Sequence, residues 1–588
     1  MSSFEQTVHD YLSHLYGHRA GEVQRRLNQR LEHFQPLAPV PSAPAEVPAK
    51  NAPSWSEKDQ WVISYGDSIV QEGTPPLAVL SDFLKTRLGE RISGVHVLPF
   101  FPWSSDDGFS VIHYREVNPE LGDWSHIREL ASHYDLMADL VLNHVSRESL
   151  WFVDYLSGSL PGRDYFIEVD PDTDVSQVVR PRSSPLLVPI STRRGTRYLW
   201  ATFSEDQLDL NFENPDVLLE FIGILLFYLE QGTRIIRLDA VAFLWKRLGT
   251  ACIHLPETHT VVRLLRAIVD HLAPGTLLVT ETNVPHKENI SYLGLHRLPK
   301  GPPDEAHMIY QFTLPPLLLH TLTRGEASTL QTWLASLPVL PAHCTYLNFT
   351  ASHDGIGVRP LEGLLPDHER DALLELMHKF GGFVSMRSNP DGSDTPYEIN
   401  ITWFEAMRGT RRGPDPWQIA RFLCSQAIML SLQGIPALYI HTLTGTLNDV
   451  EGVERSGRLR SINRRRWQRS ELELLIDSPS TPTHDVFRAL NRLLDQRRQE
   501  PCFHPNAAQR VLDSCPEVLA VERGPLSDGR RLLALYNVTD LPLPLEKMGE
   551  AVTQALSQHD WQALDPANPW EASGALPPYA VRWLVAIG

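Results

Sequence analysis

Three carboxylates, those of Asp239, Glu281 and Asp354, each lie at the end of a short apolar segment or just after it. When such segments are the parallel strands of a barrel, the side chains at their ends converge on one pocket. Retaining glycosyl transfer needs one ionised nucleophile, one protonated acid and a further group that stabilises positive charge at the anomeric carbon. The sequence therefore predicts Asp239 as nucleophile, Glu281 as general acid/base and Asp354 as the third active-site carboxylate.

Neighbouring residues support these roles. Arg237 lies two residues before Asp239, so on a strand both side chains point to one face and the guanidinium can keep the carboxylate ionised. Glu281 needs a raised pKa to deliver a proton, and partial burial beside another carboxylate would raise it. Taken singly, an Arg-x-Asp pair is commonly a structural ion pair, and the sequence His353-Asp354-Gly is commonly a turn. Their joint occurrence on successive segments favours a catalytic site.

Eight short apolar segments alternate with longer helical patterns after residue 55. Parallel strands need crossover helices and are buried on both faces, so this alternation predicts a closed (β/α)8 barrel, an α/β fold. The active site of such a barrel lies at the C-terminal ends of its strands. The predicted strands are Trp61–Tyr65, Gly94–Pro99, Leu136–Leu142, Ile235–Asp239, Leu277–Glu281, His307–Phe312, Thr345–Phe349 and Ala437–His441.

The rest of the chain is predicted to form attachments to the barrel. Residues 3–33 show helical periodicity, and the prolines at residues 36–53 predict an extended linker after them. The long gap after the third strand predicts an inserted subdomain over the barrel mouth, and the C-terminal segments favour β structure. The predicted boundaries are 1–54 for the helical extension and linker, 55–143 and 234–484 for the barrel, 144–233 for the inserted subdomain and 485–588 for a small C-terminal β domain.

Composition excludes several classes of partner. A formal net charge of −18 would repel nucleic acid and anionic membranes, so neither is expected as a partner. Five widely spaced cysteines without a CxxC pair favour reduced thiols. The N-terminal segment lacks the pattern of a signal peptide, and no apolar stretch reaches the roughly 18 residues of a membrane span. We therefore expect a cytoplasmic protein, whose oligomeric state the sequence leaves open, a homodimer included.

No cofactor and no metal are expected. The first strand is not followed by a Gly-x-Gly-x-x-Gly sequence, and the chain has neither a Walker loop nor a calcium-loop pattern. The chemistry of the predicted site must then come from its own side chains.

Four segments resemble the diagnostic blocks of the α-amylase family of glycoside hydrolases, and they occur in the order of that family. They are Ala138–His144, Ile236–Val241, Thr280–Asn283 and Ala351–Gly357. Further segments narrow the resemblance to the sucrose-phosphorylase group within the family, over roughly residues 58–588. These are Leu98–Phe101, Gly108–Phe109, Leu121–Trp124, Leu314–Leu319 and Arg460–Arg464.

The resemblance implies a retaining glycoside phosphorylase, whose partners are a small sugar substrate and inorganic phosphate. In that group a glucosyl unit passes to the aspartate matching Asp239, while the glutamate matching Glu281 protonates the departing acceptor. Phosphate, deprotonated by the same glutamate, then attacks to give α-glucose 1-phosphate. The resemblance also implies that the glucosyl ring is held by Asp106, with Asp107 as the neighbouring alternative, and by His144, Arg237, His353, Asp354 and Arg460.

Two segments resemble the phosphate and acceptor contacts of the same group. Arg180–Pro185 resembles its Arg-Pro-Arg segment, and Arg182 is the predicted phosphate ligand because a guanidinium can bind phosphate through two hydrogen bonds. The alternative for Arg182 is a solvated loop arginine. Pro396–Asn400 resembles the mobile loop that exchanges acceptor and phosphate contacts, and Tyr397 is expected to face the site.

One departure from the group bears on the substrate. Asn283 stands where sucrose phosphorylases carry a histidine, two residues after the acid. The surrounding Thr282–Ser291 and the segment Gln207–Pro215 are more similar to the glucosylglycerate phosphorylase branch. This predicts 2-O-α-D-glucosyl-D-glycerate as substrate and Asn283 as a substrate-binding residue. The candidates for contacts with an acidic acceptor are Arg182, Arg193, Arg194, Lys287 and Tyr397.

Other functions stay open at this stage. The chain could be a sucrose or sucrose 6-phosphate phosphorylase, or an α-glucosidase or transglucosidase with the same carboxylates. The carboxylates alone do not decide between phosphorolysis and hydrolysis, because phosphate and water attack the same intermediate. A non-catalytic relative would be expected to lack a catalytic carboxylate, and all three are present.

Overall fold

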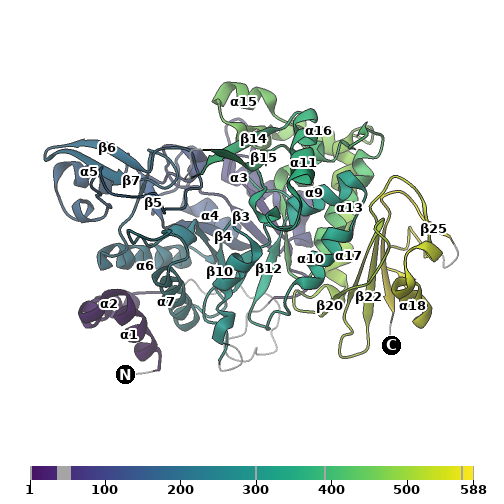
Figure 1. Ribbon diagram of the computed structural model, residues 1–588, viewed down its shortest axis with the longest axis horizontal. Coiled ribbons are helices and arrows are strands. Elements are labelled where there is room, and N and C mark those ends of the chain that lie inside the picture. The colour runs from purple at the N-terminus through teal and green to yellow at the C-terminus, as the bar shows by residue number, and fades with distance from the viewer. Residues whose placement is uncertain (1–2, 36–54, 298–300, 390–392, 571–573, 587–588) are drawn as a thin grey trace.

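The computed structural model describes residues 3–35, 55–297, 301–389, 393–570 and 574–586. A central barrel is flanked by two N-terminal helices on one side and by a C-terminal sheet on the other (Figure 1). The predicted proline-rich linker falls on residues 36–54, which lie outside the described residues.

Eight parallel strands close the barrel in the order β1-β18-β12-β11-β10-β9-β4-β3. Almost all of their residues are buried, because helices cover the outside of the barrel and side chains fill its interior. The (β/α)8 fold predicted from the sequence is confirmed. The strands are β1 (Trp61–Ser64), β3 (Gly94–Val97), β4 (Asp135–Val141), β9 (Thr233–Asp239), β10 (Leu277–Thr280), β11 (Met308–Tyr310), β12 (Thr345–Asn348) and β18 (Ile435–Tyr439).

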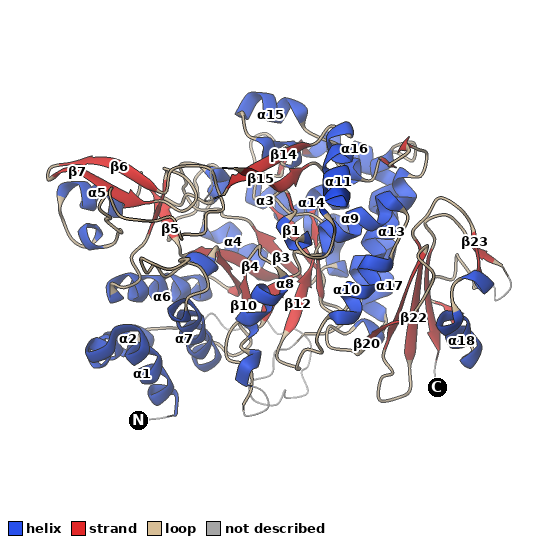
Figure 2. Ribbon diagram, viewed as in Figure 1, coloured by secondary structure: helices blue, strands red, loops and turns tan. Residues whose placement is uncertain are grey.

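The crossover helices surround the strands (Figure 2). Helix α6 (Pro215–Glu230) shows how the sequence produces one of them. The side chain of Asn214 caps its first turn by accepting from the Asp216 N–H, proline occupies the first helical position, and eleven of its 16 residues are buried. The other covering helices are α3 (Pro76–Phe83), α4 (Trp124–Ala131), α7 (Pro256–Leu272), α9 (Leu314–Arg324), α10 (Ser328–Ser336), α13 (Gln418–Ser431), α16 (Arg469–Asp477) and α17 (Pro482–Gln499).

Between β4 and β9 the chain makes an excursion before it returns to the barrel through α6. The excursion contains the β5–β8 pair, a β6–β7 hairpin and a short helix. Its predicted end at residue 233 is placed too late, because α6 is a buried barrel helix that leads directly into β9. The elements are β5 (His144–Ser146), α5 (Leu150–Ser157), β6 (Leu187–Thr192), β7 (Gly195–Trp200) and β8 (Gln207–Asp209).

A second excursion, which the sequence analysis did not identify, lies between β12 and β18. It forms a three-stranded antiparallel sheet in the order β13-β15-β14, near the top of the molecule in Figure 2. Residues 396–400, predicted to lie in a mobile loop, belong to strand β15. Tyr397 is therefore carried by a paired strand. The elements are β13 (Ile356–Gly357), α11 (Asp367–Lys379), β14 (Phe383–Ser388), β15 (Asp394–Asn400) and α12 (Trp403–Ala406).

The helical periodicity near the N-terminus forms a hairpin of two helices, α1 (Ser3–Tyr16) and α2 (Ala20–Glu32). Gly17, with a φ of +54°, follows α1 and allows the chain to turn there. The hairpin packs against α6 and α7, as Figure 1 shows. Its buried contact face consists of Val8, Leu12, Tyr16, Ala20, Val23 and Leu27.

Helix α17 crosses the predicted start of the C-terminal domain at residue 485. It packs against α13 and α16 and so belongs to the barrel, which places the structural boundary after Gln499. The remainder is a five-stranded antiparallel sheet with a two-stranded sheet and a helix packed against it. The elements are β20 (Gln509–Val511), β21 (Val518–Arg523), β22 (Arg531–Asn537), β23 (Leu543–Pro544), α18 (Glu550–Gln558), β24 (Gln562–Ala563), β25 (Ala575–Leu576) and β26 (Val581–Ala586).

The five cysteines carry no disulfide, and four of them are buried. These thiols pack as small apolar side chains. Within the described ranges, no helix combines the length and the apolar character needed to cross a membrane.

Candidate active site

Asp239 is held in place by a buried ion-pair network. It ends β9, and its Oδ1 accepts a hydrogen bond of 2.6 Å from Arg237 Nη1. The same nitrogen donates to Asp139 Oδ1 at 2.5 Å, and Asp139 also contacts His96 Nε2 at 2.6 Å. Asp139 lies opposite Arg237 in the β4–β9 register and is fully buried. Arg237 thus bridges two carboxylates and fixes the orientation of Asp239.

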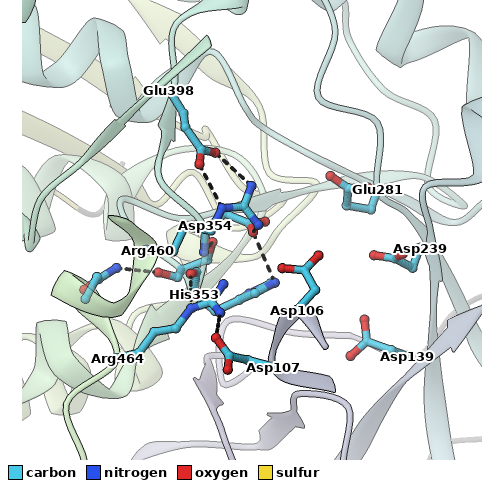
Figure 3. A network of polar contacts seen from close by, with 12 residues as sticks. Asp106, Asp107, Asp139, Asp239, Glu281, His353, Asp354, Glu398, Arg460 and Arg464 are labelled. Atoms are coloured by element: carbon cyan, nitrogen blue, oxygen red, sulfur yellow. Dashed lines mark hydrogen bonds and ion pairs between the residues drawn. The ribbon is translucent and has the colours of Figure 1, made fainter. Parts of the chain in front are cut away.

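Glu281 is brought beside Asp239 by the pairing of β9 and β10. Its backbone N–H donates to the Leu238 carbonyl at 3.1 Å. Ala240 has a φ of +50°, which is uncommon for a residue with a side chain, and its N–H donates to Glu281 Oε2 at 3.2 Å. The strained backbone of Ala240 therefore directly follows Asp239 in the chain and contacts Glu281. Figure 3 shows both of them pointing from one side of the site toward Asp106.

The two carboxylates have different electrostatic surroundings. Burial raises the pKa of Glu281 from 4.5 to about 7; Arg237 opposes this increase, whereas Asp239 and Asp354 add to it. Burial also raises the pKa of Asp239, but the adjacent Arg237 guanidinium opposes the change and favours the ionised form. Glu281 can consequently donate a proton near neutral pH, while the guanidinium of Arg237 favours the ionised form of Asp239 beside it. This difference is what an acid and a nucleophile in one site require.

Asp354 lies on the opposite side of the site (Figure 3). Its Oδ1 is 2.5 Å from Arg460 Nη1, and Arg460 also binds both oxygens of Glu398, at 2.8 and 2.9 Å. Burial alone would raise the pKa of Asp354, but Arg460 and then His353 hold it well below its usual range. Asp354 is therefore a fixed negative charge.

His353 packs against the aromatic floor of the site. Its ring stacks on Phe109 with the centroids 4.8 Å apart, and the Tyr65 ring lies edge-on at 5.9 Å. Its Nε2 is 3.4 Å from Asp354 Oδ1. Burial holds the pKa of His353 well below its usual range, so the imidazole is neutral and one ring nitrogen can donate a hydrogen bond.

A turn with three successive positive φ angles forms another wall. Asp106, Asp107 and Gly108 have φ values of +52°, +48° and +114°. A Cβ at Gly108 would lie 2.7 Å from the Pro99 carbonyl oxygen, so this position requires glycine. Asp106 lines the cavity, whereas Asp107 forms ion pairs with Arg458 and Arg464. The structure thus favours Asp106 over its neighbour as the residue that faces a substrate.

His144 is positioned by hydrogen bonds to the same turn. Its Nε2 is 2.9 Å from the Phe109 carbonyl oxygen and 3.2 Å from Gln207 Nε2. Gln207 also donates to Asp106 Oδ2 at 3.2 Å, which connects the inserted excursion with the barrel. Behind His144, Asn143 Oδ1 accepts from Lys246 Nζ at 2.7 Å.

One cavity at the C-terminal end of the barrel brings together eleven of the residues predicted for the site. Phe109, Phe203, Gln207, Ala240 and Glu398 complete its lining. The individual roles stay predictions, but the side chains share one space. The eleven residues are Asp106, His144, Arg182, Arg237, Asp239, Glu281, Asn283, His353, Asp354, Tyr397 and Arg460.

The candidate acceptor contacts divide into two sets. The Arg182 guanidinium lies 5.3 Å from the centre of the Tyr397 ring, and both residues line the cavity. Arg193 and Arg194 are exposed at the turn of the β6–β7 hairpin, where Arg194 pairs with Glu168, and Lys287 is exposed on the short helix α8 (His286–Asn289). Arg193, Arg194 and Lys287 do not line the cavity.

Sequence reasoning missed several residues that position the site. Gln207 lies in the excursion between β4 and β9, and Glu398 lies in the excursion between β12 and β18. The folds of these two excursions could not be recognised from a sequence pattern. Asp139 and His96 did carry a signal, because charged and polar side chains are unusual inside the apolar strands of a parallel barrel. Their network explains how a charged Arg237 can be buried there.

Comparison with known proteins places this geometry in a family. Residues 82–346 match the alpha amylase catalytic domain. The chain is 44% identical to the glucosylglycerate phosphorylase of Allomeiothermus silvanus, over 99% of this chain and 98% of the relative. It is 43% identical to that of Escherichia coli K12, over 91% and 93%. The crystal structure of sucrose 6F-phosphate phosphorylase from Thermoanaerobacter thermosaccharolyticum superposes with a TM-score of 0.70 at 24% identity, covering 82% of this chain and 94% of that one.

A (β/α)8 barrel with three carboxylates at its strand ends and an excursion after its third strand defines an α-amylase type of catalytic domain. The identity to the relatives extends over nearly the whole chain. The chain belongs to the α-amylase family and, within it, to the glycoside phosphorylases.

Proposed function

We propose that the chain is a retaining phosphorylase that converts 2-O-α-D-glucosyl-D-glycerate and inorganic phosphate into α-D-glucose 1-phosphate and D-glycerate. The observation that carries the proposal is the 44% identity to a glucosylglycerate phosphorylase over 99% of the chain. The cavity supports it, because its carboxylates occupy the positions that retaining transfer needs. The chemistry requires no group beyond the two substrates and these side chains.

The first half-reaction transfers the glucosyl unit to the enzyme. Asp239 attacks the anomeric carbon, and the bond from this carbon to O2 of glycerate breaks. Glu281 gives its proton to the departing oxygen, for which its raised pKa is suited. The hydrogen bond from Arg237 keeps Asp239 ionised and oriented for the attack. The product is a β-glucosyl ester on Asp239, with free glycerate.

The second half-reaction transfers the glucosyl unit to phosphate. Glu281, now a carboxylate, removes a proton from phosphate, whose oxygen attacks the anomeric carbon and displaces Asp239. Two inversions give net retention, so the product is α-glucose 1-phosphate. Arg182 and Tyr397 lie together on the cavity wall and are the proposed contacts of phosphate.

We assign the glucosyl ring to the part of the cavity that holds the three catalytic carboxylates. Asp106, His144, His353 and Arg460 line the same cavity and are the proposed contacts of the ring. The fixed charge of Asp354 stabilises positive charge that develops on the ring in the transition state. Asn283 also lines the cavity. Because it stands where sucrose phosphorylases carry a histidine, it supports glycerate over fructose as the acceptor.

The choice of acceptor is tested by synthesis from α-glucose 1-phosphate, with release of phosphate as the signal. We expect rapid release with D-glycerate and release at least tenfold slower with fructose or glycerol, because a site built for an anion loses about 1.5–3 kcal/mol without it. Release with fructose 6-phosphate should be as slow, because its charged group lies at the far end of the sugar from the reacting oxygen. Preference for fructose or its phosphate would keep the mechanism and overturn the substrate. Release at one rate with every acceptor and with none would indicate a hydrolase.

A second prediction concerns pH. Since Glu281 must be protonated for glycerate to leave and its pKa is raised to about 7, kcat/KM for the glucoside should decrease as pH rises above about 7. This parameter reports the first half-reaction and is independent of phosphate ionisation. Initial rates at low glucoside concentration across neutral pH give the profile. A midpoint near 4.5, the ordinary value for glutamate, would contradict the effect of burial.

We also propose a cytoplasmic location. The support for it is that all five cysteines are free, as expected of a protein in a reducing compartment.

A further inference from the structure

A second cavity adjoins the catalytic cavity at Glu281. Its walls include apolar side chains of Val179, Pro181, Ala242, Phe243 and Val284. Three arginines, Arg180, Arg359 and Arg387, line the same cavity. The two cavities share five lining residues, namely Phe203, Ala240, Glu281, Asn283 and Tyr397.

Arg180 stands out because its charge is not neutralised. Its Nε and Nη2 are buried and have no hydrogen-bond partner among the described residues. Most arginines of this acidic chain are paired with carboxylates, whereas Arg180 forms no ion pair within the described ranges. Arg180 as a whole is partly exposed, but burying two of its donor nitrogens without a partner is costly, so such a group is normally paired with an anion. Arg180 therefore indicates a place for an anionic ligand.

The other two arginines are held at the rim of the same space. Arg359 Nη2 is 4.0 Å from Glu288 Oε2, and its buried Nε has no partner among the described residues. Arg387 donates to Thr395 Oγ1 at 3.1 Å and to Glu362 Oε1 at 3.2 Å, which fixes its guanidinium. Both place a guanidinium in the wall of a cavity whose other lining is partly apolar, where charges interact more strongly than in water.

Asn283 adds an uncharged contact between Glu281 and these arginines. Its Oδ1 is buried and lacks a partner among the described residues. The side chain fits only because residue 357 is glycine: a Cβ at Gly357 would lie 2.7 Å from Asn283 Nδ2 and 2.8 Å from its Oδ1. Asn283 is thus held close against β13 with a free acceptor atom for a ligand hydroxyl group.

The proposed reaction places an anion at this position twice. In glycerate the carboxylate is attached directly to the carbon that carries the reacting oxygen. In phosphate the charged oxygens share one phosphorus atom with the reacting oxygen. Either ligand brings negative charge close to Glu281, which is itself a carboxylate when it acts as base. Cations beside Glu281 would offset this repulsion.

We propose that Arg180, with Arg359 and Arg387, forms an anion subsite next to Glu281 that binds the charged group beside the reacting oxygen, a carboxylate or a phosphate. This inference rests on the proposed function and adds to it the residues that select an acidic acceptor. A neutral acceptor gains nothing from this subsite.

The test uses α-D-glucosyl fluoride as donor, because its leaving group needs no contact with the arginines. Transfer from this donor to D-glycerate, to phosphate, to glycerol and to water is measured for the wild type and for Arg180→Gln. We expect the variant to need roughly 10- to 100-fold more glycerate or phosphate for half-maximal transfer, as for loss of a charge-assisted hydrogen bond. Transfer to glycerol and hydrolysis should change by less than about twofold.

Two further variants keep the result interpretable. Arg180→Lys retains the charge and should recover part of the affinity, which a merely misfolded variant would not do. Arg193→Gln removes the same charge from the exposed hairpin of the same excursion and should behave as wild type.

The four acceptors separate the outcomes. Weaker use of glycerate alone identifies the carboxylate as the ligand, weaker use of phosphate alone identifies phosphate, and weaker use of both means that they share the subsite. An equal loss with glycerol and water, or no loss at all, overturns the subsite. If the wild type transfers to neither anion, the proposed function itself is wrong.

Discussion

Replacing Asp239 with asparagine is expected to reduce phosphorolysis by roughly 10⁴-fold or more, because an amide cannot form the glucosyl ester. Asparagine has nearly the same shape as aspartate and can keep one contact with Arg237 through its oxygen, so the fold should be retained. Steady-state rates on the glucoside, together with a thermal melt, measure both effects. The loss should appear equally with α-glucosyl fluoride, because every donor requires the nucleophile.

A matched control is Asp371→Asn, which makes the same chemical change at an exposed position on α11. It should leave the rate within about twofold of wild type, as is usual for surface substitutions. Near wild-type turnover by Asp239→Asn would show that another group is the nucleophile. The network of Arg237, Asp139 and His96 would then have only a structural role.

Replacing Glu281 with glutamine should affect the donors unequally. Transfer from the glucoside should decrease by roughly 10²- to 10⁴-fold, because its leaving oxygen needs a proton that the amide does not supply. Glucosylation by α-glucosyl fluoride should be nearly preserved, since fluoride leaves without a proton from Glu281. Rapid-quench measurements of the first turnover with each donor give the two rates, and the decrease above neutral pH should disappear with the glucoside.

The same variant should also accumulate the covalent intermediate. Without a base to activate phosphate or glycerate, the glucosyl ester on Asp239 should break down slowly after reaction with the fluoride. Mass spectrometry of the intact protein and of its peptides should then find one glucosyl group on Asp239. An equal loss with both donors, or a glucosyl group on another residue, would contradict the assigned roles.

The barrel was predictable from the sequence because its strands are short, apolar and regularly separated by helices. The catalytic carboxylates were predictable because each one follows such a strand. The ends of the excursions were less predictable: α6 is apolar on almost every side, and its pattern alone does not tell which domain it joins. The sheet that carries Tyr397 has short strands with mixed polarity, and it resembled a loop for that reason.

The electrostatic details depend on the three-dimensional structure. No spacing rule links Arg460 to Glu398, which lies 62 positions earlier in the chain. Nor does one link Arg237 of β9 to Asp139 of the neighbouring strand β4. That Arg180 has no carboxylate partner among the described residues follows only from where the folded chain places its carboxylates. The positive φ of Ala240, which turns its N–H toward Glu281, is likewise a property of the folded chain.

The most direct test of the account is the product formed from 2-O-α-D-glucosyl-D-glycerate with inorganic phosphate, followed by phosphorus and proton NMR. The account predicts α-glucose 1-phosphate from the first turnovers, in equal amount with glycerate, and little product when phosphate is omitted. Free glucose formed at the same rate with and without phosphate, or β-glucose 1-phosphate as the first product, would contradict retaining phosphorolysis by this site.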